Sequence, residues 1–442
     1  MSAFLQFATV VALILGLLGV MAGLSHIARK HAWHPEVARK IVHVAASGIA
    51  IPLPWVFPDA WPVWLLLGLS LAAMLAMRTP LLAGPGRALH SVERRSWGDV
   101  LLVISVGLVL LLHRGEPVLY ILPLLVLALG DAAAALTGST YGRTFYLTED
   151  GRKSVEGSTM LFLVTLILAM ACLLLLTEIG RGPLIVVAVA IAVFATVIEA
   201  DSWRGFDNLF LPMGVFLFLS NIVGVSGDTS QPRMALPLLA LVLSYGISRM
   251  AGMNPQVSRI HAVALFLILS ATNFWNAILP AGVLVVHAIV SARRQERLLA
   301  SDTLNVVSGL ALVSFGFLAL GTASGASAIN FYGLVCGTIA AAHAARGLPR
   351  MAKAPGILAA LAVAAAIWAV WLFVTGHNSA ATHWHGQIGI PAAAAIATAA
   401  LAPVLWPRMF QGSAGLSATL IGAVPALVLY ALTFFLAGSG GG

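Results

Sequence analysis

Long apolar runs are the feature that most limits what this chain can fold into. About sixteen runs are long enough, or nearly so, to cross a bilayer as helices of roughly 17–25 residues. Of the 442 residues, 60% are hydrophobic and 9% are charged, whereas a typical soluble protein is about half apolar and a quarter charged. We therefore predict an all-α polytopic membrane protein with about 16 transmembrane helices.

The predicted spans fall into two sets of eight. The first set has its apolar cores at 4–24, 41–58, 60–78, 100–113, 117–138, 159–178, 183–198 and 208–225. The second set has its cores at 234–250, 260–278, 279–291, 303–321, 328–345, 356–375, 389–406 and 417–437. The runs at 100–113 and 279–291 are short, which leaves the total open by two. No basic segment precedes the first run, so we interpret it as a retained helix rather than a cleaved signal.

Lysine and arginine residues predict the orientation of these spans. If the N-terminus is outside and the spans alternate, only Arg114, Arg181 and Arg233 of the 24 lysines and arginines fall outside. Cytoplasmic loops of membrane proteins carry such an excess of positive charge. We therefore expect both termini outside, and we attribute the net charge of +8 to this bias rather than to nucleic-acid binding.

Two pairs of similar segments suggest an internal repeat. "HPEVARK" (34–40) follows the first run and "NPQVSRI" (254–260) follows the ninth, while "ERRSWGD" (93–99) precedes the fourth and "ERLLASD" (296–302) precedes the twelfth. A duplication would give two like-oriented eight-helix halves related by an axis along the membrane normal. Chance similarity between basic loops is the alternative, and both interpretations stay open.

The acidic residues are distributed unevenly between the predicted domains. We predict a membrane domain at 1–228, a second one at 229–437 and a flexible glycine-rich tail at 438–442. Of the 16 acidic residues, only Glu296 and Asp302 lie after residue 230. If the chain was duplicated, the second domain is a degenerate repeat without catalytic carboxylates, so we expect catalysis in the first domain.

Ionisable residues of the first domain gather near helix ends on the predicted cytoplasmic side. They are Arg39, Lys40, His43, Asp99, Asp131, Arg152, Lys153, Glu156, Glu199 and Asp207, with Asn208 beside them. Asp131 is the most informative, because a carboxylate within a spanning helix costs about 2.5–3.5 kcal/mol and so usually has a partner or a function. We expect it roughly 9 Å from the cytoplasmic end of its helix. A structural ion pair with an arginine is the alternative.

The stretch "GRKSVEGS" (151–158) predicts an anion site. It places Arg152 and Lys153 just before a helix N-terminus, where backbone N–H groups and the helix dipole favour anions. Gly138 and Gly142 are expected to shape a turn for phosphate oxygens. Carboxylates nearby suggest Mg²⁺, which is typically held by one or two carboxylates and by phosphate oxygens. The pattern therefore indicates a nucleotide–Mg²⁺ site, although simple anchoring of positive charge explains part of it.

Four segments resemble the family of CTP-dependent polyprenol kinases, which includes dolichol, phytol and farnesol kinases. They are "RKIVHVAASG" (39–48), "LGDAAAALTGSTYGR" (129–143), "KSVEGS" (153–158) and "IEADSWRGFDNLFLP" (198–212). CTP:phosphatidate cytidylyltransferases share part of this pattern, but they normally carry an Asp-Arg-x-Asp-Ser sequence where this chain has "FDNLFLP". The resemblance covers about residues 30–225. It implies Mg²⁺-dependent transfer of the terminal phosphoryl group of CTP to a lipid alcohol of the isoprenoid class, such as phytol, farnesol, dolichol or another polyprenol.

The resemblance also implies roles for single residues. The implied catalytic residues are Asp131, Lys153 and His43, with His43 or Asp131 as the general base, and the implied metal ligands are Asp131, Asp207 and Glu199. The implied nucleotide-binding residues are Arg39, Lys40, Arg152, Lys153, Ser154, Glu156, Gly157, Gly138, Gly142 and Asn208. A helix-capping histidine is the alternative for His43.

A transporter is the second class of function that the sequence leaves open. Sixteen helices in two like-oriented halves would suit one, with a substrate path where the repeats meet. Transport sites tend to lie near the membrane midplane, however, whereas the charged residues of this chain gather at one face. The expected partners are therefore CTP and a membrane lipid alcohol, with the active site on the cytoplasmic face.

Overall fold

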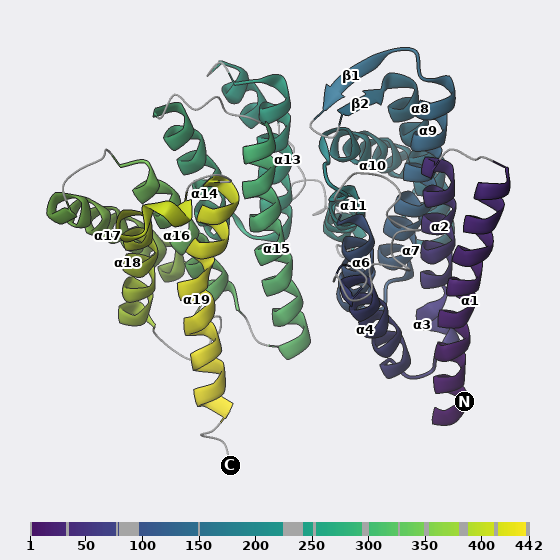
Figure 1. The fold of residues 1–442 in the computed structure, drawn as a ribbon, viewed down its shortest axis with the longest axis horizontal. Coiled ribbons are helices and arrows are strands. Elements are labelled where there is room, and N and C mark those ends of the chain that lie inside the picture. The colour runs from purple at the N-terminus through teal and green to yellow at the C-terminus, as the bar shows by residue number, and fades with distance from the viewer. Residues whose placement is uncertain are drawn as a thin grey trace. The chain divides into compact units, whose positions relative to one another are not determined.

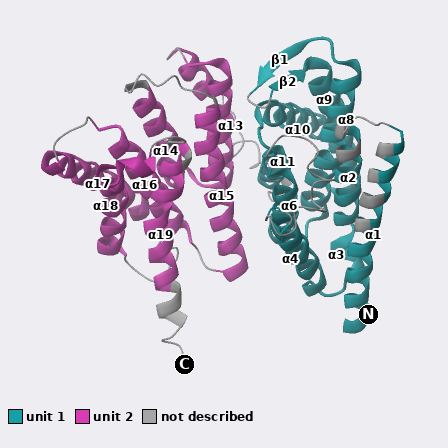
Figure 2. Cartoon of the chain, in the orientation of Figure 1, with its two compact units in different colours: residues 1–230 teal, residues 231–442 magenta. Residues whose placement is uncertain are grey.

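The chain folds into two compact units in a computed structural model, Met1–Ser230 and Gln231–Gly442 (Figure 2). The structure describes residues 2–31, 35–76, 78, 97–148, 151–223, 242–250, 253–293, 300–325, 328–348, 353–379, 388–410 and 414–438. The predicted domain boundary at 228/229 lies beside this division, and the roles assigned to the two domains remain predictions. The predicted tail at 438–442 lies almost entirely outside the described residues.

Unit 1 is helical, with one small hairpin (Figure 1). Its helices are α1 Ala3–Lys30, α2 Pro35–Ala50, α3 Leu53–Val56, α4 Trp61–Ala76, α6 Gly98–Leu112, α7 Pro117–Leu125, α8 Asp131–Tyr141, α9 Val155–Leu176, α10 Arg181–Asp201 and α11 Asp207–Val223. A π-helical turn, η2 Val126–Gly130, joins α7 to α8 in one continuous helix. The predicted run at 41–58 is divided, since α2 ends at Ala50 and the short α3 follows.

The connection between α8 and α9 departs from the all-α expectation. Strands β1 Phe145–Thr148 and β2 Gly151–Ser154 pair antiparallel, with Tyr146 opposite Lys153. This segment is too polar and too short to span a bilayer, so its backbone groups pair with each other in a hairpin instead. The Arg152 guanidinium lies over the Phe145 ring, 4.7 Å from its centroid, and adds a contact between the strands.

Glycines allow α8 and α9 to pack closely. A Cβ atom at Gly157 would lie 2.8 Å from the Ala134 carbonyl oxygen and 3.3 Å from the Gly138 Cα atom. Real Cβ atoms do not approach a backbone oxygen that closely, so glycine at 157 sets the spacing of the two helices. Small residues at helix contacts commonly permit such close approach in membrane proteins.

Unit 2 is also helical, and α16 lies at its centre. Its helices are α13 Pro255–Ala271, α14 Phe274–Arg293, α15 Ala300–Ser324, α16 Ile329–Arg346, α17 Lys353–Gly376, α18 Gly389–Leu405 and α19 Ala414–Gly438, with a 3₁₀ turn η4 Pro407–Phe410 and a further helical segment at 242–250. α16 is buried along nearly its whole length, and α14, α17, α18 and α19 pack against it.

One predicted helix boundary in unit 2 is wrong. The predicted runs 260–278 and 279–291 meet after residue 278, but in the structure the helix break falls at residues 272–273. Pro280 lies inside α14. The Asn273 side chain accepts a hydrogen bond from the Asn276 N–H at 2.9 Å and so caps the first turn of α14. The capping residue, rather than the proline, therefore decides where this helix begins.

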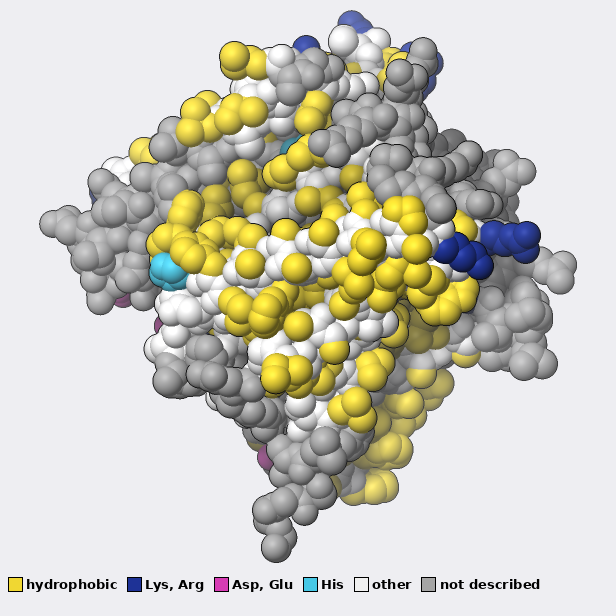
Figure 3. Space-filling model, turned by 90° about the vertical axis from the view of Figure 1, so that its left-hand side faces the viewer, with side chains coloured by type: hydrophobic (Ala, Val, Ile, Leu, Met, Phe, Trp, Pro, Cys, Tyr) yellow, Lys and Arg dark blue, Asp and Glu magenta, His cyan; other side chains and the backbone are white. Residues whose placement is uncertain are grey.

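Several helices have the length and composition of membrane spans. Within the described ranges six qualify: Pro117–Tyr141, Val155–Leu176, Arg181–Asp201, Phe274–Ser291, Ser301–Ser324 and Lys353–Gly376. Others, such as α4 and α6, are apolar but shorter. Apolar side chains point outward, for example Ile167 (66% exposed), and hydrophobic side chains spread over the face in Figure 3. These features fit a multi-pass membrane protein, whereas the total of sixteen spans and their orientation remain predictions.

We expect Gly157→Ala to destabilise unit 1, because the added methyl group collides with the Ala134 carbonyl and pushes α9 away from α8. Overpacking of this kind typically costs about 1–3 kcal/mol. Thermal unfolding of the detergent-purified protein measures the effect. Gly68→Ala on α4 is the matched control, because a Cβ atom there meets nothing within 4 Å. An unchanged unfolding temperature for Gly157→Ala would contradict the close packing described here.

Candidate active site

A buried ion pair joins α2 to α8. The Lys40 Nζ atom donates to Asp131 Oδ2 at 2.5 Å, and the two side chains are 5% and 4% exposed. One partner of Asp131 is thus a lysine on a neighbouring helix. Removing either charge would leave the other buried and uncompensated, a loss that typically costs about 3–5 kcal/mol.

Asp131 directly follows the π-helical turn η2. π-Helical turns are rare and frequently occur at functional sites. α8 continues to Tyr141, so Asp131 lies about 15 Å from the end of its helix at 1.5 Å per residue, deeper than the 9 Å expected. The carboxylate is therefore set well inside the helical part of the unit.

Two hydroxyl groups beside η2 form a feature that the sequence analysis missed. Ser47 on α2 and Thr165 on α9 are fully buried, and neither hydroxyl has a hydrogen-bond partner in the described part of the chain. The Thr165 Oγ1 atom lies 3.3 Å from the position a Cβ atom would take at Gly130, next to Asp131. Both α2 and α9 pack against η2. No sequence signal distinguishes these hydroxyls, because serine and threonine are common in membrane helices.

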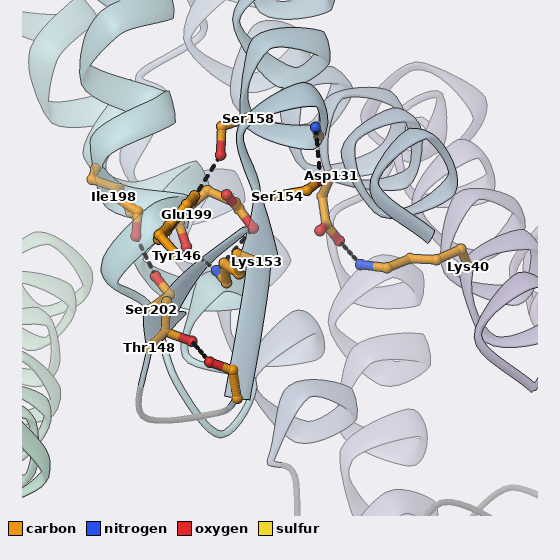
Figure 4. Close-up of polar contacts among 12 residues, drawn as sticks. Lys40, Asp131, Tyr146, Thr148, Lys153, Ser154, Ser158, Ile198, Glu199 and Ser202 are labelled. Atoms are coloured by element: carbon orange, nitrogen blue, oxygen red, sulfur yellow. Dashed lines mark hydrogen bonds and ion pairs between the residues drawn. The ribbon is translucent and has the colours of Figure 1, made fainter. Parts of the chain in front are cut away.

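Lys153 forms a second group of charges at the start of α9. Its Nζ atom donates to Glu199 Oε1 at 2.8 Å and to the Glu199 carbonyl oxygen. The hairpin positions Lys153, and the end of α10 positions Glu199 (Figure 4). Next to them, the Tyr146 hydroxyl on β1 shares a 2.7 Å hydrogen bond with Ser158 on α9. In Figure 4 this group and the Lys40–Asp131 pair lie on either side of Ser154.

The surrounding carboxylates keep Lys153 charged. Burial alone would lower the pKa of Lys153, but the negative charges of Glu199 and then Asp207 more than offset that effect. The pKa of Lys153 is therefore raised above its ordinary value. Since Asp207 begins α11, the interaction also shows that the start of this helix lies near Lys153. Lys153 carries a full positive charge throughout the physiological pH range.

Other predicted nucleotide-binding residues hold the local structure together. The Ser154 hydroxyl accepts from the Gly157 N–H at 3.1 Å and caps α9, and the Glu156 carboxylate accepts from the Thr144 N–H at 3.1 Å. The Asn208 side chain donates to the Gly98 carbonyl oxygen at 2.7 Å and ties α11 to α6. Their predicted contacts with a nucleotide remain predictions.

The expected phosphate-binding turn at the two glycines is wrong in part. Gly138 lies inside α8, and Gly142 follows the end of that helix. A Cβ atom at Gly142 would lie 2.4 Å from the Gly138 carbonyl oxygen, so this glycine permits a tight helix end. Both glycines therefore have a packing role, and a contact with phosphate remains a prediction.

The remaining predicted residues lie on α2 and β2. His43 is half-buried and lies three residues after Lys40, so both share a face of α2 with Ser47. Arg152 is exposed on the hairpin. The side chain of Arg39 lies outside the described residues.

Asp131, Asp207 and Glu199 are the carboxylates predicted to bind Mg²⁺. Among the described residues, no group of three or more His, Cys, Asp or Glu side chains is placed to hold a metal. Asp131 pairs with Lys40, so it does not join Asp207 and Glu199 in one protein-only site. Mg²⁺ often takes only one or two carboxylates together with substrate phosphates, and Glu199 and Asp207 near Lys153 fit that donor set.

The chain is similar to a curated protein of known activity. The chain is 33% identical over 183 residues to the phytol kinase of Synechocystis sp.. The aligned residues cover 40% of this chain and 76% of that protein. No family model matches the chain, and no solved structure matches it. The similarity extends over most of the relative's length, and all four motif segments lie within unit 1. The chain therefore belongs to the phytol kinase family.

Proposed function

We propose that the chain is a membrane kinase that transfers the terminal phosphoryl group of CTP to the hydroxyl of an isoprenoid lipid alcohol of the phytol class. The observation that carries this proposal is the group formed by Lys153, Glu199 and Asp207 at adjoining helix ends. This group lies beside the start of α9, where an anion is favoured. Membership of the phytol kinase family supports the reaction class.

The nucleotide phosphates would bind at the hairpin end of α9. Lys153 supplies a point charge, and the exposed guanidinium of Arg152 on the same strand supplies a planar pair of donors. The ion pair with Glu199 fixes the position of Lys153, so a triphosphate would meet a cation that is already in place. Catalysis of phosphoryl transfer depends mainly on such positioning and charge stabilisation.

A Mg²⁺ ion, when bound with the nucleotide, would neutralise charge on the phosphates, with Glu199 and Asp207 as its protein ligands. Both carboxylates already interact with Lys153, so protein charges of both signs surround the place where the phosphates would lie. This arrangement would hold the terminal phosphate in a fixed direction.

The lipid alcohol would bind on the membrane side of the same helices. Its hydroxyl needs hydrogen-bond partners in an apolar setting, and the unpartnered hydroxyls of Ser47 and Thr165 beside η2 supply them. Asp131, next to η2, would accept the proton of the alcohol as its oxygen attacks the terminal phosphorus and the bond to CDP breaks. Lys40 would hold the carboxylate in position.

We expect γ-labelled CTP to transfer its label to phytol or farnesol when the purified protein is supplied with Mg²⁺. Chelation by EDTA should abolish transfer, because without Mg²⁺ the carboxylates of Glu199 and Asp207 would repel the phosphates. Product analysis by thin-layer chromatography measures the result, with ATP, dolichol and diacylglycerol as alternative substrates. Transfer of label from α-labelled CTP to phosphatidate would instead indicate a cytidylyltransferase. Absence of any transfer would favour a transporter.

We expect Lys153→Gln to lower kcat at least about 100-fold, since comparable losses follow removal of one charge-stabilising donor in other enzymes. Lys353→Gln is the matched control, because Lys353 is exposed at the start of α17 in unit 2. The same label-transfer assay measures both variants, and thermal unfolding checks that Lys153→Gln is folded. Full turnover by a folded Lys153→Gln protein would show that the nucleotide site lies elsewhere.

We expect Thr165→Val to raise the KM for the lipid alcohol several-fold while the KM for CTP stays unchanged. The substitution keeps the shape of the side chain and removes one hydrogen bond to the substrate, a loss of about 0.5–1.5 kcal/mol. Thr159→Val is the matched control on α9, because the Thr159 hydroxyl bonds to the Val155 carbonyl oxygen of its own helix. An equal change in both KM values would point to a structural role for Thr165.

A further inference from the structure

Unit 2 contains a group of buried histidines that the proposed kinase reaction does not use. His287 on α14 and His343 on α16 pack edge to face, with ring centroids 5.6 Å apart. The His343 Nε2 atom shares a 3.2 Å hydrogen bond with the Thr419 hydroxyl on α19. His261 on α13 is also buried. Because His261 also interacts electrostatically with His287, side chains from four helices contribute to one polar centre. Figure 1 shows these helices as α13, α14, α16 and α19.

Several ring nitrogens in this centre lack a protein partner. Four buried ring nitrogens form no hydrogen bond with any described residue: Nδ1 and Nε2 of His287, Nδ1 of His343 and Nε2 of His261. His287 is 1% exposed and His343 is fully buried. A buried polar group without a partner typically costs about 1–3 kcal/mol, and in a native protein it commonly marks an unseen ligand, ion or water.

The centre lies at one end of the helical unit rather than at its middle. His261 lies near the start of α13, His287 near the end of α14, His343 near the end of α16 and Thr419 near the start of α19. At 1.5 Å per residue these positions are roughly 5–9 Å from the helix ends. All four residues therefore lie within about two turns of a helix end.

The charge of unit 2 favours an anion as the ligand. Residues 231–442 hold ten lysines and arginines but only two acidic residues, whereas residues 1–230 hold fourteen of each. The whole net charge of +8 therefore belongs to unit 2. Arg346 is buried on α16, three residues after His343, and is 6% exposed. Among the described side chains, further charged groups on helices at this end include Arg259 on α13, Asp302 on α15 and Lys353 on α17.

A metal ion fits this centre less well. Within the described ranges, no three His, Cys, Asp or Glu side chains are placed to hold a metal. Metal sites built on two histidines usually need a further thiolate or carboxylate ligand. An anion instead needs N–H donors, which the imidazole rings and the Arg346 guanidinium provide.

We propose that His287, His343 and Arg346 form a binding site for a phosphate group. An arginine guanidinium suits phosphate oxygens because its donors form a planar fork, and imidazole N–H groups add further donors. The phosphate belongs either to free inorganic phosphate or to the headgroup of a lipid phosphate monoester. The site rests on unit 2 alone, although a lipid phosphate monoester is also the product class of the proposed reaction.

Binding to the full-length chain in detergent tests the proposal. We measure thermal stabilisation by inorganic phosphate and by farnesyl monophosphate, with farnesol as the uncharged comparison and zinc as the metal probe. The proposal predicts stabilisation by at least one phosphate compound, and none by farnesol or zinc. Stabilisation by phosphate alone identifies the free anion, whereas stabilisation by farnesyl monophosphate alone identifies the lipid headgroup.

Variants assign the binding to unit 2. His287→Phe and the milder His287→Gln should weaken phosphate binding about tenfold or more, equivalent to about 1.4 kcal/mol. His377→Phe is the matched control, because His377 is exposed after the end of α17. Lys153→Gln should bind phosphate normally, which separates this site from the kinase site.

Two outcomes would overturn the proposal. One is unchanged phosphate binding in folded His287→Phe or His287→Gln protein, and the other is loss of all binding in Lys153→Gln. Kinase activity is measured in parallel for every variant. A chain that binds phosphate in unit 2 but lacks kinase activity would disprove only the proposed function, and the reverse result would disprove only this site.

Discussion

The ion pair between Lys40 and Asp131 is the interaction on which the rest of unit 1 depends. An isolated carboxylate among apolar helices is costly, and a cation within hydrogen-bond distance is what makes its burial tolerable. The pair holds α2 against α8, and it does so directly after the π-helical turn η2. The turn, the charge pair and the buried hydroxyl of Thr165 beside Gly130 therefore lie close together in the unit.

Close packing of α8 and α9 connects this region to the second charged group. Glycines 138 and 157 let the two helices approach, and the Ser154 cap begins α9 at the point where the hairpin ends. The hairpin then directs Lys153 towards the end of α10, where Glu199 receives it. Gly138, Ser154 and Gly157, which were predicted to bind the nucleotide, thus form part of the scaffold that positions Lys153.

Much of the fold could be predicted from apolar runs, since each such run must satisfy its backbone hydrogen bonds as a helix in a membrane. The run at 389–406 corresponds to α18, and that at 183–198 to α10. The apolar runs do not reveal features that depend on local polar contacts. Asn273 sets the start of α14, and Tyr146 pairs with Lys153 across a hairpin. The distribution of lysine and arginine predicted a layer of charged residues at one face. Which residues form ion pairs depends on helix packing, so the pairs Lys40–Asp131 and Lys153–Glu199 could not be predicted from the sequence. The buried histidines of unit 2 could not be grouped from the sequence, because they lie far apart along the chain and only helix packing brings them together.

The two units differ in the partners that their sequences provide for buried polar groups. In unit 1, Lys40 and Lys153 each contact a carboxylate, and the positive and negative residues of its sequence balance. Unit 2 has almost no carboxylates in its sequence, yet it buries Arg346 and three histidines near one end. The unpartnered ring nitrogens of His287 and His343 in this acid-poor unit can be satisfied by an anion that arrives from outside. A membrane protein that makes a lipid phosphate would have a use for such a site, because the product carries negative charge, which is scarce in the sequence of unit 2.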